Sequence, residues 1–236
     1  MIALVFAVAL AQSPCADHAA LMSVVADRAA VFDLKSATTR LAEGIECPEI
    51  AVAYWYVHGL IAARDAYRYG GSAESLEPVK LAIKQLESRS PGSSAAEIAQ
   101  VVLQAASAAA QSEREEMGLL LEHALNLEKQ ARAAGQPGAP IVSAFEVTGD
   151  LWLQVHRFED AHRAYVAASA QVGSTRRITL GLARTAFRLG ELPAACEHYR
   201  ILVSGWPKSG GEPPELGEAR TFLRRAECRA GSSSQR

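Results

Sequence analysis

The chain repeats itself towards its C-terminal end, where the stretch 142–175 matches the stretch 176–209. A shift by one such unit superimposes residues of similar size or polarity: Gly149 on Ala183, Phe158 on Leu192, Ala161 on Ala195, Tyr165 on Tyr199, and Ala168 on Leu202. Self-similarity at a fixed period indicates a repeat architecture, in which one small structural unit stacks on the next.

Each unit is predicted to be a helical hairpin. Apolar residues recur at helical spacing, stop at short turns at 156–158 and 190–192, and then resume. Gly149 and Ala183 must be small because the two helices of each hairpin cross there. Aromatic residues make up only 6% of the chain and alanine is abundant, which favours closely packed helices. We therefore expect an all-α fold.

The two units resemble the tetratricopeptide repeat (TPR), a helical hairpin with small and aromatic residues at fixed places. The residues that carry the resemblance are Phe145, Gly149, Trp152, Ala161 and Tyr165 in the first unit, and Leu182, Ala183, Ala186, Ala195, Tyr199 and Pro207 in the second. The resemblance is clear over 142–209 and weak upstream. It implies a right-handed α-solenoid of antiparallel helical hairpins with a C-terminal capping helix.

The chain divides into four predicted parts: a signal peptide at 1–11, a degenerate helical-repeat region at 12–140, the TPR-like repeats plus capping helix at 141–230, and a disordered tail at 231–236. The first part is an apolar run that ends in Ala9-Leu10-Ala11, the small-x-small pattern of signal-peptidase sites, although no Lys or Arg precedes it. We expect a periplasmic or secreted protein, or a cytoplasmic one if this run is not a signal peptide.

Local patterns predict further helices. Residues 94–97 and 112–115 both have the S-x-x-E pattern of a capping box, so we expect two longer helices between residues 70 and 139. Pro213-Pro214 precedes an apolar stripe that predicts a single capping helix from about 215 to 229.

The four cysteines form two pairs of equal separation. Cys15 and Cys47 lie as far apart along the chain as Cys196 and Cys228. An antiparallel hairpin brings Cys15 and Cys47 to the same end, and Cys196 begins a helix beside the predicted end of the capping helix at Cys228. In an oxidising compartment we expect two disulfides, each stabilising the fold by about 3 to 4 kcal/mol.

Motifs of catalysis are missing from the sequence. It contains no H-E-x-x-H, G-x-S-x-G, C-x-x-C or phosphate-binding glycine loop, and its net charge of −2 gives no nucleic-acid footprint. Glu159 and His162 have E-x-x-H spacing, but a second such motif is lacking, so we interpret them as structural. We expect no enzyme activity, cofactor, metal or nucleic-acid partner, and no stable membrane span after signal removal.

The strongest candidate for function is a surface. Arg177, Arg184 and Arg188 share one face of the first helix of the second unit, and the TPR resemblance implies that this face lines a concave groove. The predicted groove residues are Arg177, Leu180, Arg184, Phe187 and Arg188, with Glu146, Asp150 and Leu153 from the first unit. Such a groove suits an extended peptide, although Asp150 and Arg184 could instead simply pair with each other.

The sequence thus predicts a non-catalytic scaffold of the bacterial cell envelope that binds a protein or peptide partner. Two alternatives remain open. One is a small-ligand-binding or enzymatic helical protein with a pocket between the middle helices and the repeats. The other is an architectural subunit of a larger assembly, which a broad exposed apolar face would indicate.

Overall fold

A computed structural model describes residues 15, 18–30, 33–206 and 212–230, and within these residues every regular element is a helix. The all-α prediction is therefore confirmed. The predicted signal peptide, Pro207 and the predicted tail lie outside the described residues. The helices are α1 (His18–Ala30), α2 (Leu34–Ala42), α3 (Pro48–Arg68), α4 (Glu77–Arg89), α5 (Ser94–Ala110), α6 (Arg114–Ala133), α7 (Ala144–Gln154), α8 (Phe158–Val172), α9 (Arg176–Arg188), α10 (Leu192–Ser204), α11 (Pro214–Leu223) and α12 (Ala226–Ala230).

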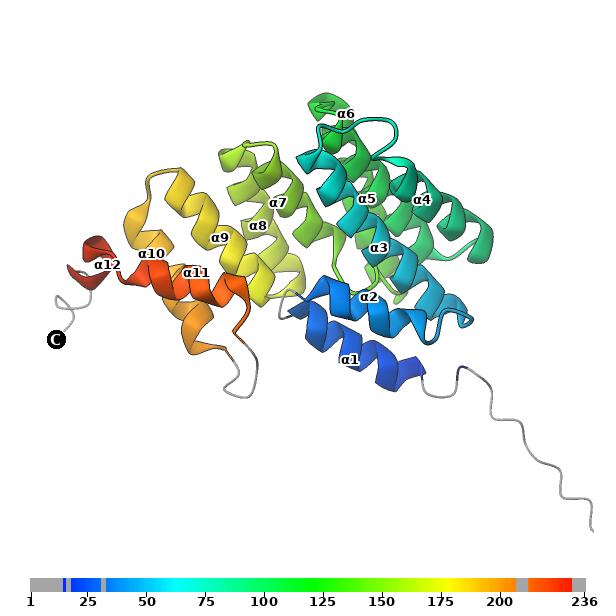
Figure 1. Ribbon diagram of the computed structural model, residues 1–236, viewed down its shortest axis with the longest axis horizontal. Helices are drawn as coiled ribbons and strands as arrows, with labels where there is room; N and C mark the ends of the chain where they lie inside the picture. Colours follow the sequence, from blue (N-terminus) through cyan, green and yellow to red (C-terminus); the bar gives the residue numbers. More distant parts are fainter. Residues whose placement is uncertain (1–14, 16–17, 31–32, 207–211, 231–236) are drawn as a thin grey trace, which may run out of the picture.

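Consecutive helices pack against each other as hairpins (Figure 1). The pairs are α1 with α2, α3 with α4, α5 with α6, α7 with α8, and α9 with α10. The first helices of successive hairpins also touch, α3 with α5, α5 with α7, and α7 with α9. These first helices therefore form one continuous layer. The turns at 155–157 and 189–191 lie one residue before the predicted turns at 156–158 and 190–192, because Phe158 and Leu192 already begin the second helices.

The C-terminal segment continues the register of the repeat. The second helices α8, α10 and α12 begin at Phe158, Leu192 and Ala226, which are equivalent positions of successive units. α11 and α12 thus replace the single helix that we expected over 215–229. The N–H groups of Arg224 and Arg225 bond carbonyls three residues back, and this tight turn ends α11 and lets α12 fold against α10.

The middle of the chain holds three helices instead of the expected two, and neither predicted capping box forms. Ser93, not Ser94, caps α5, because its hydroxyl accepts a bond from the Ala96 N–H. Ser112 has a positive φ of 67° and its N–H bonds the Ala109 carbonyl, so it closes α5 and does not begin α6.

Two buried hydrogen bonds connect α6 and α3 to the start of the repeats. The Glu128 carboxylate on α6 is fully buried, pairs with Arg132 at 2.6 Å and accepts a 2.7 Å bond from the Ala144 N–H at the start of α7. The Tyr56 hydroxyl on α3 donates to the Val142 carbonyl at 2.9 Å. Because a buried polar group is costly when unpaired, both bonds fix α7 relative to the helices before it.

Tyr165 of α8 fills the space that two glycines leave open. A Cβ built on Gly149 of α7 would lie 2.5 Å from the tyrosine ring, and one on Gly181 of α9 would lie 2.2 Å from it. Neither distance is possible between real atoms, so only glycine allows α7 and α9 to close over this buried ring. The small residue predicted at the Gly149 crossing is explained by this contact.

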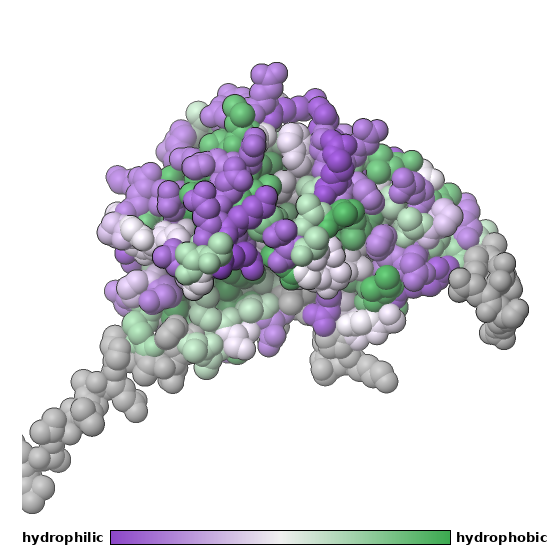
Figure 2. All heavy atoms as spheres, turned by 180° about the vertical axis from the view of Figure 1, so that it is seen from behind, coloured by the Kyte–Doolittle hydropathy of each residue, from purple (hydrophilic) through white to green (hydrophobic). Residues whose placement is uncertain are grey.

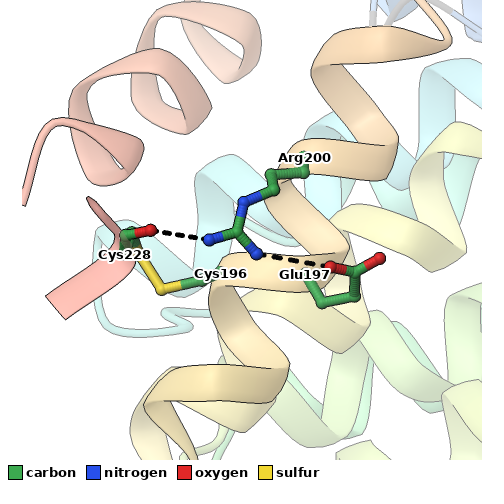
Figure 3. Close-up of a disulfide and its surroundings, with 4 residues drawn as sticks. All are labelled: Cys196, Glu197, Arg200 and Cys228. Atoms are coloured by element: carbon green, nitrogen blue, oxygen red, sulfur yellow. Dashed lines mark hydrogen bonds and ion pairs between the residues drawn. A yellow bond between two sulfur atoms is a disulfide. The ribbon is translucent and has the colours of Figure 1, made fainter. Parts of the chain in front are cut away.

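Both cysteine pairs lie at disulfide distance. The Cα–Cα separations are 5.6 Å for Cys15–Cys47 and 5.5 Å for Cys196–Cys228, within the range that a disulfide spans. Figure 3 shows the second bond, with Arg200 donating to the Cys228 carbonyl at 2.6 Å. Such pairs point to an oxidising compartment outside the cytoplasm. No helix in the described ranges is both long and apolar enough to cross a membrane.

Candidate ligand-binding groove

The first helices of the hairpins border a cavity of about 390 Å³. Its walls come mainly from α3, α7 and α9, with two residues from α8, single residues from α2, α5 and α11, and His156 from the turn before α8. We call it the first-helix groove, and the residues used below are Leu60, Arg64, Arg68, Leu153, Leu180 and Arg188. Its volume is within the usual range of ligand sites.

Most of the predicted site residues line this groove. They are Asp150, Leu153, Arg177, Leu180, Arg184 and Arg188. Phe187 lines a neighbouring cavity instead. Glu146 lines neither cavity.

Glu146 belongs to the start of α7 and not to the groove. It is only 5% exposed and completes a capping box with Ser143. Its other oxygen accepts a bond from the Thr175 hydroxyl, which caps α9. Burial raises the pKa of the Glu146 carboxyl, against the opposing effects of Thr175 and Arg177. The side chain therefore ties two helix starts together.

Asp150 pairs with Arg177, and not with Arg184 as we considered from the repeat spacing. The Arg177–Asp150 distance is 2.5 Å, and the Arg177 side chain is 15% exposed. The Tyr165 hydroxyl donates to the other Asp150 oxygen at 2.6 Å. Burial alone lowers the pKa of Arg177, but the charges of Asp150 and Glu146 outweigh it and raise that pKa. Arg177 is thus held as a cation inside the wall of the groove.

Arg184 makes its ion pair with Glu218 of α11. The guanidinium binds both carboxylate oxygens, at 3.0 and 2.6 Å, and the Tyr199 hydroxyl donates to the same carboxylate at 2.7 Å. Burial raises the pKa of Glu218, but the bonds and charge of Arg184 outweigh it and leave that pKa below its ordinary value. Glu218 was not among the predicted site residues, although it lies one repeat unit after Arg184.

The charge of the groove is strongly one-sided. Its lining contains five arginines but only one aspartate and one glutamate, in a chain whose net charge is −2. Arg64 and Arg188 are exposed and form no ion pair with any residue that the structure describes. Arg68 is exposed and pairs with Asp65 at 3.5 Å. These side chains leave guanidinium groups available to an acidic ligand.

Arg64 and Arg68 were not predicted. They lie on α3, where the resemblance to the repeat is weak, and only their spacing of four residues places them on one helix face. Nothing local in the sequence indicates that the end of α3 lies near α7. The Tyr67 hydroxyl makes that contact by donating to the Gln154 carbonyl at 2.7 Å.

A second cavity of about 430 Å³, which we call the α9–α11 pocket, continues the groove towards α11. It shares Arg184 and Arg188 with the groove, and its aromatic lining consists of Phe187, Tyr199 and Phe222. The Arg225 guanidinium lies 4.9 Å from the Phe187 ring and 4.5 Å from the Phe222 ring. The two cavities are therefore neighbours on the same face, with Arg184 and Arg188 between them.

The acidic and histidine-rich stretch around residue 159 reaches the groove only through His156 and Phe158, and its acidic residues do not line it. Glu159 is exposed, Asp160 pairs with Arg157 at 2.6 Å, and the His162 ring contacts the Thr185 hydroxyl at 3.3 Å. Across the described ranges, no three His, Cys, Asp or Glu side chains cluster as metal ligands.

No protein-family model, curated protein or solved structure matches the chain. The function must therefore be inferred from the groove itself.

Proposed function

We propose that the protein is a TPR-like α-solenoid and a non-catalytic scaffold that binds an acidic segment of a partner protein in the first-helix groove. The observation that carries this proposal is that Arg64 and Arg188 in the groove lining are exposed and form no ion pair within the described residues, while Arg177 and Arg184 are already paired. A carboxylate that meets an exposed guanidinium forms a charge-assisted hydrogen bond, which is stronger than a neutral one.

The packing of the helices supports the solenoid part of the proposal. The first helices α3, α5, α7 and α9 each touch the next in one layer, and the second helices pack behind them. The starts of α8, α10 and α12 keep a constant spacing along the chain. A stack of this kind presents one extended face, on which a partner segment can lie.

The dimensions of the groove suit a short extended segment. Packed helices lie about 9 Å apart, so α3 to α9 spans about 27 Å, and an extended chain of about eight residues covers that length. Arg64 lies towards one end of this path and Arg188 towards the other. The partly exposed Leu60 and Leu153 provide apolar contact within the groove, whereas Leu180 is buried in its wall.

We place this scaffold in the bacterial cell envelope, either periplasmic or secreted. The two cysteine pairs at disulfide distance support that placement, because disulfides persist mainly outside the cytoplasm. The test is the intact mass of protein from its native host after thiol alkylation with and without reductant. We expect four alkylated thiols only after reduction, and four without reduction would refute this location.

A small anionic molecule is the second candidate ligand. The volume of about 390 Å³ favours it, because small-molecule sites have this size. The two possibilities predict a different dependence of affinity on peptide length. A peptide ligand should bind more tightly as a Glu/Asp series grows from two to eight residues, whereas a small-molecule site should show no gain beyond two or three.

An architectural role has less support from the surface. On the face that Figure 2 shows, hydrophilic side chains cover most of the area and hydrophobic side chains lie between them in separate spots. A subunit interface typically presents a broader apolar patch.

The direct test is fluorescence anisotropy with an acetylated and amidated octapeptide of alternating Asp and Glu. Arg188→Glu should weaken binding about tenfold, because it removes one charge-assisted bond and adds repulsion. Arg114→Glu is the matched control. It makes the same charge change at an exposed residue of α6 outside the groove, so it should leave the affinity unchanged. Equal weakening by both variants would mean that only net charge matters, and the groove would not be the site.

A further inference from the structure

We propose that the α9–α11 pocket is a specificity subsite that accepts one large apolar side chain, aromatic or leucine-like, from the acidic segment bound in the first-helix groove. This inference rests on the proposed function, since it assigns a second determinant to the same ligand. The ligand class becomes an acidic segment that carries a bulky apolar residue beside its carboxylates.

The pocket exists because the last hairpin packs differently from the others. α3, α5 and α7 each pack on the next first helix, whereas α11 packs mainly on α10 and only slightly on α12. The space between α9 and α11 remains open as the cavity of about 430 Å³. Glu218 and Arg184 pair at the wall of this pocket and link α11 to α9.

The walls of the pocket are aromatic. The rings of Phe187 and Phe222 meet edge to face with centroids 5.1 Å apart, and the rings of Tyr199 and Phe222 lie 4.5 Å apart. Tyr199 and Phe222 are only 2% and 5% exposed, whereas Phe187 is partly exposed. An incoming phenyl or isobutyl group would therefore contact mainly Phe187 and the Arg225 side chain that stacks on it, and would gain the usual hydrophobic contribution there. A partner residue with only a methyl group would leave the pocket unfilled.

The rim explains why the apolar residue should be flanked by acids. Arg188 lines both cavities and is exposed, and Arg225 is also exposed at the rim while it stacks on Phe187 and Phe222. Carboxylates on either side of the buried residue would meet these two cations. A purely apolar ligand would leave them without a partner, so charge complementarity selects an acidic one.

Gly217 provides a variant that tests the pocket without disturbing the fold. It lines the pocket, and a Cβ built on it meets no atom within 4 Å. Gly217→Leu should therefore fill the cavity from the α11 side, and leucine also favours the helix more than glycine does. Gly217→Ala is the matched control, since it makes the same backbone change and adds only a methyl group.

The experiment measures binding of two acetylated, amidated octapeptides of Asp and Glu that differ at one inner position, which is Phe in one and Ala in the other. Wild-type protein and Gly217→Ala should bind the Phe peptide about tenfold more tightly than the Ala peptide. Gly217→Leu should bind both with the affinity of the Ala peptide. Circular dichroism melting checks that all three proteins are folded.

The outcomes separate the two proposals. If the Phe and Ala peptides bind wild type equally, or if Gly217→Leu keeps the Phe preference, the subsite is wrong while the acidic-segment groove stands. If neither peptide binds wild type, the proposed function is wrong and the subsite falls with it.

Discussion

Hairpins α7–α8 and α9–α10 share one backbone plan but distribute their polar bonds differently. Both bury a tyrosine at the same repeat position, Tyr165 and Tyr199. Tyr165 donates to Asp150 within its own hairpin. At the equivalent place α9 carries Arg184, which cannot accept a hydrogen bond, and Tyr199 donates to Glu218 of the next hairpin.

The difference shows how one change of charge alters the connection between repeat units. Asp150, Arg184 and Glu218 occupy equivalent positions in three successive units, and their charges alternate in sign. The α7–α8 hairpin is held to its neighbour by direct packing of α7 on α9, with the Arg177–Asp150 pair added. The terminal hairpin packs on α10 and adds the Arg184–Glu218 pair and the Cys196–Cys228 bond.

Loss of the Cys196–Cys228 bond should have the largest effect. A loop of this length corresponds to about 3 to 4 kcal/mol in the chain-entropy model. In the Cys196→Ala/Cys228→Ala variant, hydrogen exchange should accelerate in α10–α12 while α7 and α8 keep their protection. Cys15→Ala/Cys47→Ala is the matched control and should loosen α1 to α3 instead. Equal acceleration throughout the chain would show that the terminal hairpin is not a separate unit.

The next test compares two glycines in the same repeat column. Gly149→Ala should lower the free energy of unfolding by about 1 to 3 kcal/mol, because the new methyl group overlaps the Tyr165 ring. Gly217→Ala, two repeats further along, has open space and should raise it by up to about 1 kcal/mol through helix propensity. Urea denaturation measures the free energy of unfolding of both variants. A change of the same sign in the two would contradict the assigned packing.

The coupling between Arg184 and Glu218 should be smaller. A double-mutant cycle with Arg184→Met and Glu218→Gln should give an interaction free energy of about 1 kcal/mol, since the side chains are 35% and 36% exposed. The same cycle with the exposed Arg40 and Glu43 pair on α2 should give less than about 0.5 kcal/mol. Equal values in the two cycles would mean that the link to α11 adds nothing beyond a surface pair.

The pH dependence of the same pair should be the smallest effect. The folded-state pKa of Glu218 lies below its ordinary value of 4.5, so its stabilising contribution is complete above about pH 4.5 and is lost as the pH falls through the folded-state pKa. The stability difference between wild type and Glu218→Gln should therefore shrink below pH 4.5. A difference that stays constant from pH 7 to pH 3 would contradict the ionised pair.

Local signals account for the parts of the fold that the sequence predicted correctly. The helix turns at 155–157 and 189–191 follow from hydrophobic spacing, and the small residue at Gly149 follows from the helix crossing. The split into α11 and α12 could also be predicted, because one further repeat step from Leu192 leads to Ala226. We expected a single helix there because only the two units that end at residue 209 were recognised as repeats.

The site was less predictable because it combines elements that are distant in sequence. Glu146 was misplaced because helix phase alone cannot separate a groove residue from a capping one, although Ser143 three residues before it is typical of a capping box. Arg64 and Arg68 join the groove only through the stacking of α3 near α7. No pattern within α3 predicts that contact.

The central claim is that an acidic segment lies along the first helices. The most direct test is photocrosslinking of wild-type protein with the Asp/Glu octapeptide carrying a benzophenone, followed by mass spectrometry of the crosslinked fragments. We predict crosslinks to α3, α7 and α9, and their loss when unlabelled peptide competes. Crosslinks concentrated on the second helices α4, α6 and α8 would contradict the claim.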